Sequence, residues 1–435
     1  MKVVVNKMGI NGEGIAYDRK VPIFIPRVLS GEEANIEIIE DLDTYKKGKL
    51  ISVYKKSKSR IEPKCNYQHV CDGCQLMHTM VKNQLVIKKD ILTETLYKYS
   101  KINKSLVSDV VASPKYFGYR NQFKFPKKSH NGKLESGMYK EGSTHLVTIP
   151  KCIIHEKRLE EIRIEVLKIL NKYRVKDFYK KVNSGLRYVV LRGFNDNYQL
   201  TLVTGKNKLD KNCILEISKI KGIKSIYQNT NTLDNHIIMT NDFELLYGDK
   251  TIETKINEYK FNLSPNAFFQ LNIEQATNIY NYVIDQIEPC NLVVEAYSGI
   301  GAMSILAAKK AKRVKGVEYI KNAVINANNN ALINNVADKV EFVCDDAGSY
   351  LKKVKEEIDY LIIDPPRSGL DQKMLASIRK SLPKNIIYIS CNPSTLAKNL
   401  NVLNNDYQIK KILPFDMFPN TPHVESVVLM SRDEK

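Results

Sequence analysis

The sequence lacks any long hydrophobic run. Its first residues, MKVVVNKMGINGEGIAYD, reach Asn, Lys, Gly and Glu before the apolar core of a signal peptide can form. No later stretch approaches the roughly 20 apolar residues that a membrane-spanning helix needs. We therefore expect a cytoplasmic protein without a membrane partner. The length of 435 residues suits two or three domains, each with its own apolar core.

The cysteines lack the arrangement of a secreted, disulfide-linked framework. Three of the eight, Cys213, Cys290 and Cys344, stand singly within apolar segments. A thiol in such a place packs as a small hydrophobic side chain. We expect these three to be structural.

Four other cysteines have a spacing that indicates metal binding. They are Cys65, Cys71 and Cys74, spaced as Cys-x5-Cys-x2-Cys, and Cys152 far downstream. Because disulfides do not persist in a reducing compartment, this group predicts a metal ion or a metal cluster. Zinc held by three cysteines and one histidine is a chemical possibility, the candidate histidines being His69, His78 and His155.

Acidic residues are outnumbered by basic ones. Lys and Arg total 67 against 48 Asp and Glu, so the formal net charge is 67 − 48 = +19. Such an excess suits a polyanionic partner, because contacts with phosphates release condensed counterions. The charge therefore favours a nucleic acid as partner, the alternative being a surface of solvated lysines.

The pattern of apolar residues divides the chain into three predicted domains. Residues 1–57 form short alternating runs with Gly-rich turns, which predicts a small antiparallel β-barrel. Residues 58–262 contain several short strand patterns and a helix pattern near 81–98, which indicates a β-rich central domain. Residues 263–435 alternate strand and helix patterns, which predicts a doubly wound, mostly parallel α/β sheet.

The predicted barrel carries a basic and aromatic run from Tyr45 to Arg60. Such side chains can stack on bases and pair with phosphates. A solvated charged face explains the same run equally well.

Acidic residues accompany three consecutive strand patterns of the C-terminal domain. The first strand carries Glu295 and leads into a Gly-x-Gly turn, the second ends in Glu318, and the third is followed by Asp346. Glycines let a ligand approach the backbone, and acids at strand ends can accept hydrogen bonds from a ribose or an adenine amino group. Because the segment has no phosphate-binding loop, the pattern favours S-adenosylmethionine over NAD. The alternative is that these acids cap the following helices.

The next strand pattern ends in Asp364 and continues as Pro-Pro-Arg-Ser-Gly. Two successive prolines hold a rigid extended turn. Beside an adenosine site, such a turn presents a planar base to a methyl donor. It leaves open whether a nitrogen or a ring carbon of that base is methylated.

One strand later, Cys391 stands in Ser-Cys-Asn-Pro, at the carboxyl end of a core strand. A thiolate that adds to C6 of uridine makes C5 nucleophilic enough to accept a methyl group. A base must then remove the C5 proton, and Glu425 in His-Val-Glu-Ser is the candidate, since burial would raise its pKa. Taken singly, Cys391 is also explained as a buried structural thiol and Glu425 as a surface acid.

Together, the Gly-x-Gly turn, Asp-Pro-Pro-Arg-Ser-Gly, Ser-Cys-Asn-Pro, and Asp-Met-Phe-Pro followed by His-Val-Glu resemble the RNA uracil-5-methyltransferase family. This family makes ribothymidine in ribosomal and transfer RNA, and the resemblance covers nearly the whole chain. It implies a Rossmann-like S-adenosylmethionine-dependent methyltransferase domain in which Cys391 is the nucleophile and Glu425 the base. The family usually has Asp in place of Glu295 and Cys in place of Ser298, neither in a catalytic role.

The resemblance also implies ligand contacts. Cofactor contacts are expected from Gln270, Tyr297, Glu318 and Asp364, to which the strand pattern adds Asp346. In the ribosomal RNA members, the cysteine spacing holds a [4Fe-4S] cluster, which implies that Cys65, Cys71, Cys74 and Cys152 are its ligands, with zinc as the alternative.

The N-terminal barrel resembles a TRAM domain, an OB-type RNA-binding module. Since this module is found on the ribosomal RNA members and is lacking on comparable transfer RNA members, the resemblance favours 23S rRNA over the T loop of tRNA as substrate. An amino-directed purine methyltransferase would share the fold, the cofactor and the Asp364 turn, but would need no thiolate. A non-catalytic RNA-binding protein is the other alternative. In each case we expect RNA as the partner and a monomeric chain.

Overall fold

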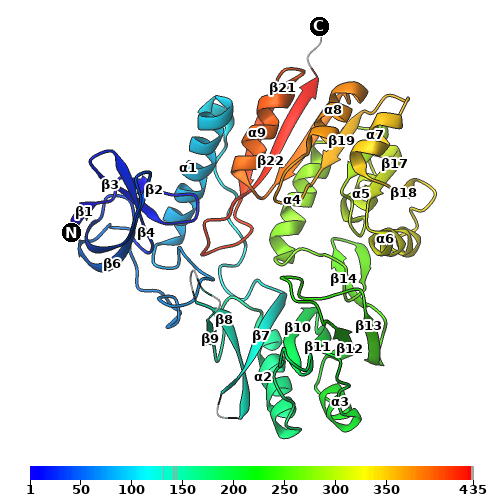
Figure 1. Cartoon of the computed structure of the whole chain (residues 1–435). Helices are drawn as coiled ribbons and strands as arrows, with labels where there is room; N and C mark the ends of the chain where they lie inside the picture. Colours follow the sequence, from blue (N-terminus) through cyan, green and yellow to red (C-terminus); the bar gives the residue numbers. More distant parts are fainter. Residues whose placement is uncertain (131, 141–142, 144, 433–435) are drawn as a thin grey trace. The chain divides into compact units, whose positions relative to one another are not determined.

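The computed structural model describes residues 1–130, 132–140, 143 and 145–432. The chain folds into two compact units (Figure 1). Met1–Pro114 and Gly348–Lys435 form the first unit, and Lys115–Ala347 forms the second. The predicted C-terminal α/β domain therefore contributes strands to both units.

The first unit begins with a six-stranded sheet of order β1-β5-β6-β4-β3-β2. Its strands are β1 (Lys2–Val4), β2 (Lys7–Met8), β3 (Gly14–Asp18), β4 (Val21–Ile25), β5 (Glu33–Asp41) and β6 (Lys46–Lys55). Neighbours run antiparallel, except that β4 and β6 are parallel. Alternate side chains such as Ile23, Ile25 and Ile36 form the core, because successive residues of a strand point to opposite faces.

Much of the basic run on this sheet is paired with acids. Lys46 lies 3.0 Å from both Asp18 and Asp41, and Lys55 lies 2.9 Å from Glu33. Ion pairs at the surface stabilise a fold only weakly, because water and salt screen them. A charged face that is balanced within the sheet therefore accounts for these lysines.

The rest of the first unit combines helix α1 with the C-terminal strands. The elements are α1 (Val81–Ser100), the 3-10 helix η1 (Lys104–Leu106), α7 (Ala347–Lys353, at the unit boundary), β19 (Tyr360–Ile363), α8 (Gln372–Ser381), β20 (Asn385–Ser390), α9 (Pro393–Leu403), β21 (Tyr407–Phe415) and β22 (Glu425–Arg432). β19 and β20 are parallel, whereas β22 is antiparallel to both β20 and β21. Helix α1 packs against α9, as Figure 1 shows.

The second unit contains a seven-stranded sheet of order β13-β12-β11-β10-β7-β8-β9. Its elements are β7 (Gln122–His130), β8 (Lys133–Tyr139), β9 (Leu146–Thr148), α2 (Lys157–Lys172), β10 (Leu186–Phe194), β11 (Asn197–Thr204), α3 (Lys211–Ser218), β12 (Ile223–Thr230) and β13 (Phe243–Gly248). The Glu156 side chain caps α2 by accepting hydrogen bonds from the Arg158 and Leu159 N–H groups. The apolar faces of α2 and α3 pack on the sheet.

The remainder of the second unit shows the predicted alternation of strand and helix. After the hairpin of β14 (Ile252–Ile256) and β15 (Tyr259–Leu263) come α4 (Ile273–Asp285), β16 (Cys290–Ala296), α5 (Ala302–Ala307), β17 (Ala311–Glu318), α6 (Lys321–Ile333) and β18 (Val340–Cys344). β16, β17 and β18 are parallel. Helix α5 ends at Ala307, since the Lys310 carbonyl accepts a hydrogen bond from the Cys290 N–H and the chain enters β17 at Ala311.

A search of the described helices finds none that is long and apolar enough to span a membrane.

Candidate active site

Cys391 and Glu425 lie at adjoining strand ends of the first unit. β20 and β22 are antiparallel neighbours whose last registered pair is Ser390 with Ser426. One step further in this register, Cys391 stands beside Glu425, the first residue of β22. Opposing Cβ atoms in such a pair are about 4.5–5.5 Å apart. The fold thus brings together two side chains that are distant in the sequence.

Asp364 and Arg367 come from the turn after β19. Because β19 and β20 are parallel, Asp364 emerges at the same edge as Cys391. The Arg367 carbonyl accepts hydrogen bonds from Asn392 Nδ2 at 3.0 Å and from Thr395 Oγ1 at 3.2 Å. These bonds hold the Arg367 turn against the residues that follow Cys391.

Burial controls the protonation of these groups. It raises the pKa of Cys391 to about 11, with the charge of Glu425 adding to the shift and Arg367 opposing it. Burial also raises the pKa of Asp364 to about 7, and it raises the pKa of Glu425 well above its usual value, with Asp364 adding to that shift. At neutral pH, the resting Cys391 thiol therefore keeps its proton.

Arg367 was not singled out from the sequence, although it stands in the Asp-Pro-Pro-Arg motif. Its positive charge lowers the pKa values of both Cys391 and Glu425. It therefore favours the ionised form of each group.

In the second unit, the turn after β16 meets the acid at the end of β17. Tyr297 and Gly301 have left-handed backbone conformations, with φ of 64° and 82°. The Gly299 N–H donates to Glu318 Oε2 at 3.0 Å, and the Ile320 N–H donates to Glu318 Oε1 at 2.8 Å. A non-glycine residue in the left-handed region costs about 1 kcal/mol or more, and such strain gathers at ligand sites.

The same turn has room and polar atoms for a ligand. A Cβ atom added at Gly299 would have no neighbouring heavy atom within 4 Å. Ser298 Oγ is buried and has no hydrogen-bond partner among the residues that the structure describes. These features fit a small polar molecule such as the nucleoside part of S-adenosylmethionine.

Glu295 has the helix-capping role that was the alternative interpretation. Its Oε2 accepts a hydrogen bond from the Ser304 N–H at 2.7 Å and a second one from the Ser304 hydroxyl. Both bonds fasten β16 to the first turn of α5. Glu295 is therefore engaged inside the unit, where only 2% of it is exposed.

Asp346 and Gln270 complete the predicted cofactor residues of the second unit. Asp346 follows β18, and β18 is in register with β17 through Cys344 and Glu318. Glu318 and Asp346 thus lie at the carboxyl ends of neighbouring parallel strands, whereas Asp364 belongs to the first unit. The Gln270 carbonyl accepts a hydrogen bond from Asn121 Nδ2 at 3.0 Å.

A cavity of about 440 Å³ lies in the second unit beside the Gln270 segment. Its lining includes Arg120, Lys124, Phe268 and Phe269. Phe268 is 72% exposed, and burial lowers the pKa of Lys124, with Arg192 and Arg120 adding to the shift. The mixture of cationic and aromatic groups suits a base or a phosphate.

The predicted metal ligands are divided between the units. Cys65, Cys71 and Cys74 belong to the first unit and Cys152 to the second. Burial raises the pKa of the Cys71 thiol, and the charge of Cys65 adds to the shift. Within the described ranges, no group of three or more His, Cys, Asp or Glu side chains is arranged to hold a metal ion. The structure therefore does not confirm the metal cluster.

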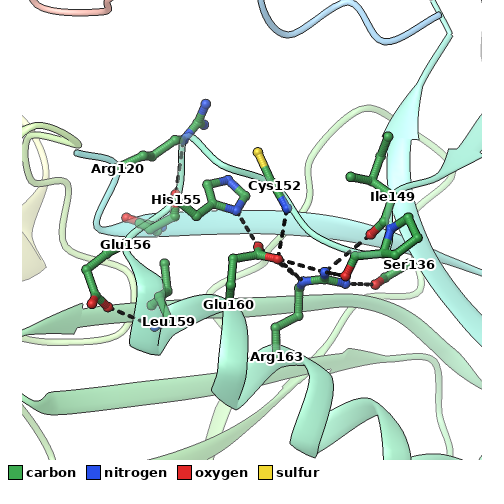
Figure 2. Close-up of polar contacts among 11 residues, drawn as sticks. Arg120, Ser136, Ile149, Cys152, His155, Glu156, Leu159, Glu160 and Arg163 are labelled. Atoms are coloured by element: carbon green, nitrogen blue, oxygen red, sulfur yellow. Dashed lines mark hydrogen bonds and ion pairs between the residues drawn. The ribbon is translucent and has the colours of Figure 1, made fainter. Parts of the chain in front are cut away.

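Cys152 lies on a loop that is held by a buried polar network (Figure 2). Glu160 accepts a hydrogen bond from the Cys152 N–H at 3.1 Å, lies 2.6 Å from His155 Nδ1 and pairs with Arg163 at 2.7 Å. Burial opposes ionisation of Glu160, but hydrogen bonds from His155 and Arg163 prevail and hold its pKa at about 2. In Figure 2 the Cys152 sulfur points away from Glu160.

The chain is similar to known RNA methyltransferases along nearly its whole length. The family described as tRNA (Uracil-5-)-methyltransferase matches residues 80–433, and the TRAM domain matches residues 1–51. A protein of Listeria innocua named an uncharacterized RNA methyltransferase is 35% identical over 99% of this chain and 97% of its own length. A protein of Bacillus cereus with the same description is 33% identical over 100% of this chain and 96% of its own.

The chain belongs to the tRNA (uracil-5-)-methyltransferase family. It is thus an S-adenosylmethionine-dependent methyltransferase that acts on RNA, as predicted. The structure of Pyrococcus abyssi tRNA (uracil-54, C5)-methyltransferase in complex with S-adenosyl-L-homocysteine matches 99% of this chain and 100% of its own, with 28% identity and a TM-score of 0.80. This likeness and the TRAM match confirm the predicted methyltransferase fold and its N-terminal domain.

Proposed function

We propose that this uracil-5-methyltransferase family member methylates C5 of one specific uridine through a covalent bond between Cys391 and C6. The observation that carries the proposal is the register of β20 and β22, which sets Cys391 beside Glu425. Asp364 and Arg367 lie at the same edge. A methyltransferase directed at an amino nitrogen has no use for a thiol and a buried acid in this arrangement.

The chemistry follows from the groups at this edge. Bound S-adenosylmethionine supplies an electrophilic methyl group. Cys391 releases its proton to solvent, which the Arg367 charge favours, and the thiolate forms an S–C6 bond. The electron pair of the C5–C6 double bond then becomes available at C5 to take the methyl group, with S-adenosylhomocysteine as the leaving group. After C5 has taken the methyl group, the Glu425 carboxylate removes the C5 proton, the double bond re-forms and the S–C6 bond breaks.

Glu425 must be ionised for this last step, although its pKa is raised in the resting site. The Arg367 charge favours that ionisation. Once the proton has moved from C5 to Glu425, burial stabilises the neutral acid that results. A raised pKa therefore assists the step in which Glu425 accepts a proton.

Removal of the nucleophile tests this mechanism. The Cys391→Ala protein is expected to lose methyl transfer while it still binds S-adenosylmethionine in calorimetry. Cys344→Ala is the matched control, since Cys344 is an exposed thiol at the end of β18. Full methyl transfer by Cys391→Ala would exclude the covalent route and favour an amino-directed enzyme, whereas absence of cofactor binding in the wild type would favour a non-catalytic RNA-binding protein.

For the RNA substrate, we propose a uridine of 23S rRNA, because this chain resembles the ribosomal RNA members of the family, which carry a TRAM domain. The T-loop uridine of tRNA is a second candidate, because a tRNA (uracil-54, C5)-methyltransferase matches this chain along its whole length, residues of the N-terminal domain included. In either case the base must leave its stack to reach a thiol at a strand end. Mapping 5-methyluridine in both RNAs from cells with and without the gene decides between the candidates.

We further propose that Cys65, Cys71, Cys74 and Cys152 hold a [4Fe-4S] cluster, with zinc as the alternative metal. Four cysteine thiolates are the usual ligands of such a cluster, and Glu160 holds the Cys152 loop through the Cys152 N–H. Such a group would organise the fold or the RNA, and no step above depends on it. Iron, sulfide and zinc contents of protein purified without oxygen, compared with those of Cys71→Ser, test this assignment.

A further inference from the structure

The loop 416–424, termed here the base loop, joins β21 to β22 and ends directly before Glu425. The two strands pair as far as Phe415 and Glu425, which stand opposite each other. The base loop therefore leaves and re-enters the sheet at the pair that contains Glu425. Movement of the base loop would therefore be transmitted through residue 424 to Glu425, the first residue of β22.

Helix α1 holds the beginning of the base loop through a buried lysine. Lys88 forms an ion pair with Asp416, and both side chains are 0% exposed. Lys88 Nζ also donates to the Phe418 carbonyl at 3.0 Å. Asp416 Oδ2 is buried and has no hydrogen-bond partner in the part of the chain that the structure covers. Lys88 is therefore the group that compensates the Asp416 charge.

One helical turn earlier, Gln84 holds the middle of the base loop. Its Oε1 accepts a hydrogen bond from the Asn420 N–H at 2.8 Å, and its Nε2 donates to Asn420 Oδ1 at 3.2 Å. Asn420 has a left-handed backbone, with φ of 69°, and its carbonyl accepts a hydrogen bond from the Leu76 N–H at 2.9 Å. Residues four apart share one face of a helix, so α1 contacts the base loop at two points.

We infer that Lys88 and Gln84 are positioning residues for the catalytic base, which hold the base loop so that Glu425 lies beside Cys391. This inference rests on the proposed role of Glu425. Neither residue is placed at the reacting atoms, and both act through the loop. A buried ion pair is often no more stabilising than apolar side chains of similar volume. Lys88 instead fixes the positions of the Asp416 carboxylate and the Phe418 carbonyl, since it contacts both.

Lys88→Met tests the inference in the full-length protein. The probe is a mixture of 23S rRNA and tRNA from cells that lack the gene, with tritiated S-adenosylmethionine. Because a displacement of about 1 Å can slow a reaction about 100-fold, kcat is expected to fall about 10- to 100-fold. KM for RNA should change by less than about twofold, and the Cys391–RNA adduct should accumulate on a denaturing gel.

Lys89→Met is the matched control. Lys89 is the next residue of α1, but its side chain is partly exposed and pairs with the exposed Asp109 at 2.7 Å. This variant should keep the wild-type kcat. An equal loss in both variants would show that any lysine of α1 matters, and would overturn the inference.

Two variants distinguish a purely structural role of Lys88 and Gln84 from a positioning role. They are Lys88→Met/Asp416→Asn and Gln84→Met, neither of which leaves a buried charge without a counterion. Their melting temperatures should lie closer to wild type than that of Lys88→Met, while kcat stays low and the adduct persists. Recovery of both stability and kcat would overturn the inference. Cys391→Ala in the same assay tests the proposed function separately. If Cys391→Ala stays active, the covalent mechanism is wrong. If Cys391→Ala is inactive but Lys88→Met keeps the wild-type kcat, the covalent mechanism stands and only the positioning role of Lys88 is wrong.

Discussion

Replacement of Glu425 by Gln should separate methyl transfer from release of the product. Gln preserves the shape of the side chain, and the first residue of β22 can keep its place opposite Phe415. The carboxylate that removes the C5 proton is lost. We therefore expect methyl transfer to proceed once on each protein molecule and then to stop.

The size of the effect follows from the burial of the site. A positioned acid or base contributes about 10²- to 10⁴-fold to a rate. Glu425 is 9% exposed, so bulk water is poorly placed to take the proton in its stead. We expect the steady-state kcat to fall about 10³-fold, the middle of that range.

The assay follows tritiated methyl groups over time and resolves protein–RNA adducts on a denaturing gel. The Glu425→Gln protein should show a burst of one methyl group per molecule and a stable adduct, and Cys391→Ala/Glu425→Gln should show neither. The rate of the burst should rise with pH, because the Cys391 thiol, whose pKa is raised to about 11, must ionise first. Normal turnover without an adduct would refute the assignment of Glu425 as the base.

Two further predictions concern the second unit. The pKa of Glu160 is lowered from 4.5 to about 2. The stabilisation that ionised Glu160 gives the folded protein is therefore complete above pH 4.5 and is lost as the pH falls through 2. Glu160→Gln should lower the free energy of unfolding by about 3 kcal/mol at pH 7 and by much less near pH 2. Urea denaturation at both pH values measures this, and an equal cost at both would contradict it. Glu318→Ala should weaken S-adenosylmethionine binding about 10- to 100-fold in calorimetry, because the bonds that we expect ribose hydroxyls to donate to this carboxylate would be lost. Glu341→Ala, which removes an exposed acid paired with Lys315, should leave the affinity unchanged.

Local motifs determined the cofactor and the reaction class. A Gly-x-Gly turn, an acid at a strand end and Asp-Pro-Pro act through backbone geometry that a few consecutive residues set, so each is visible in the sequence. The alternation of strands and helices after residue 263 was visible for the same reason, because amphipathic periodicity is a local property. These signals sufficed for the methyltransferase fold and for the family.

The roles of individual charged residues, and which distant residues lie next to each other, were harder to predict from the sequence. Glu295 lies near the end of an apolar strand, as Glu318 does, yet the structure shows that Glu295 caps α5 through Ser304. Arg367 is one of many basic residues in the sequence, and only the parallel pairing of β19 with β20 brings its turn to Cys391. The cysteine spacing suggested a metal cluster, but spacing alone does not place Cys152 with the other three thiols.

The sequence by itself therefore determined what this protein carries: a TRAM domain, a methyl-donor site, a thiol and an acid. Only the tertiary structure decided that Glu425 begins the strand beside Cys391 and that Lys88 is a buried partner of Asp416. A lysine on a helix usually lies in solvent, because burial of its charge is costly without a counterion. That counterion, Asp416, lies more than 300 positions away in the chain, so no local sequence pattern predicts the pair.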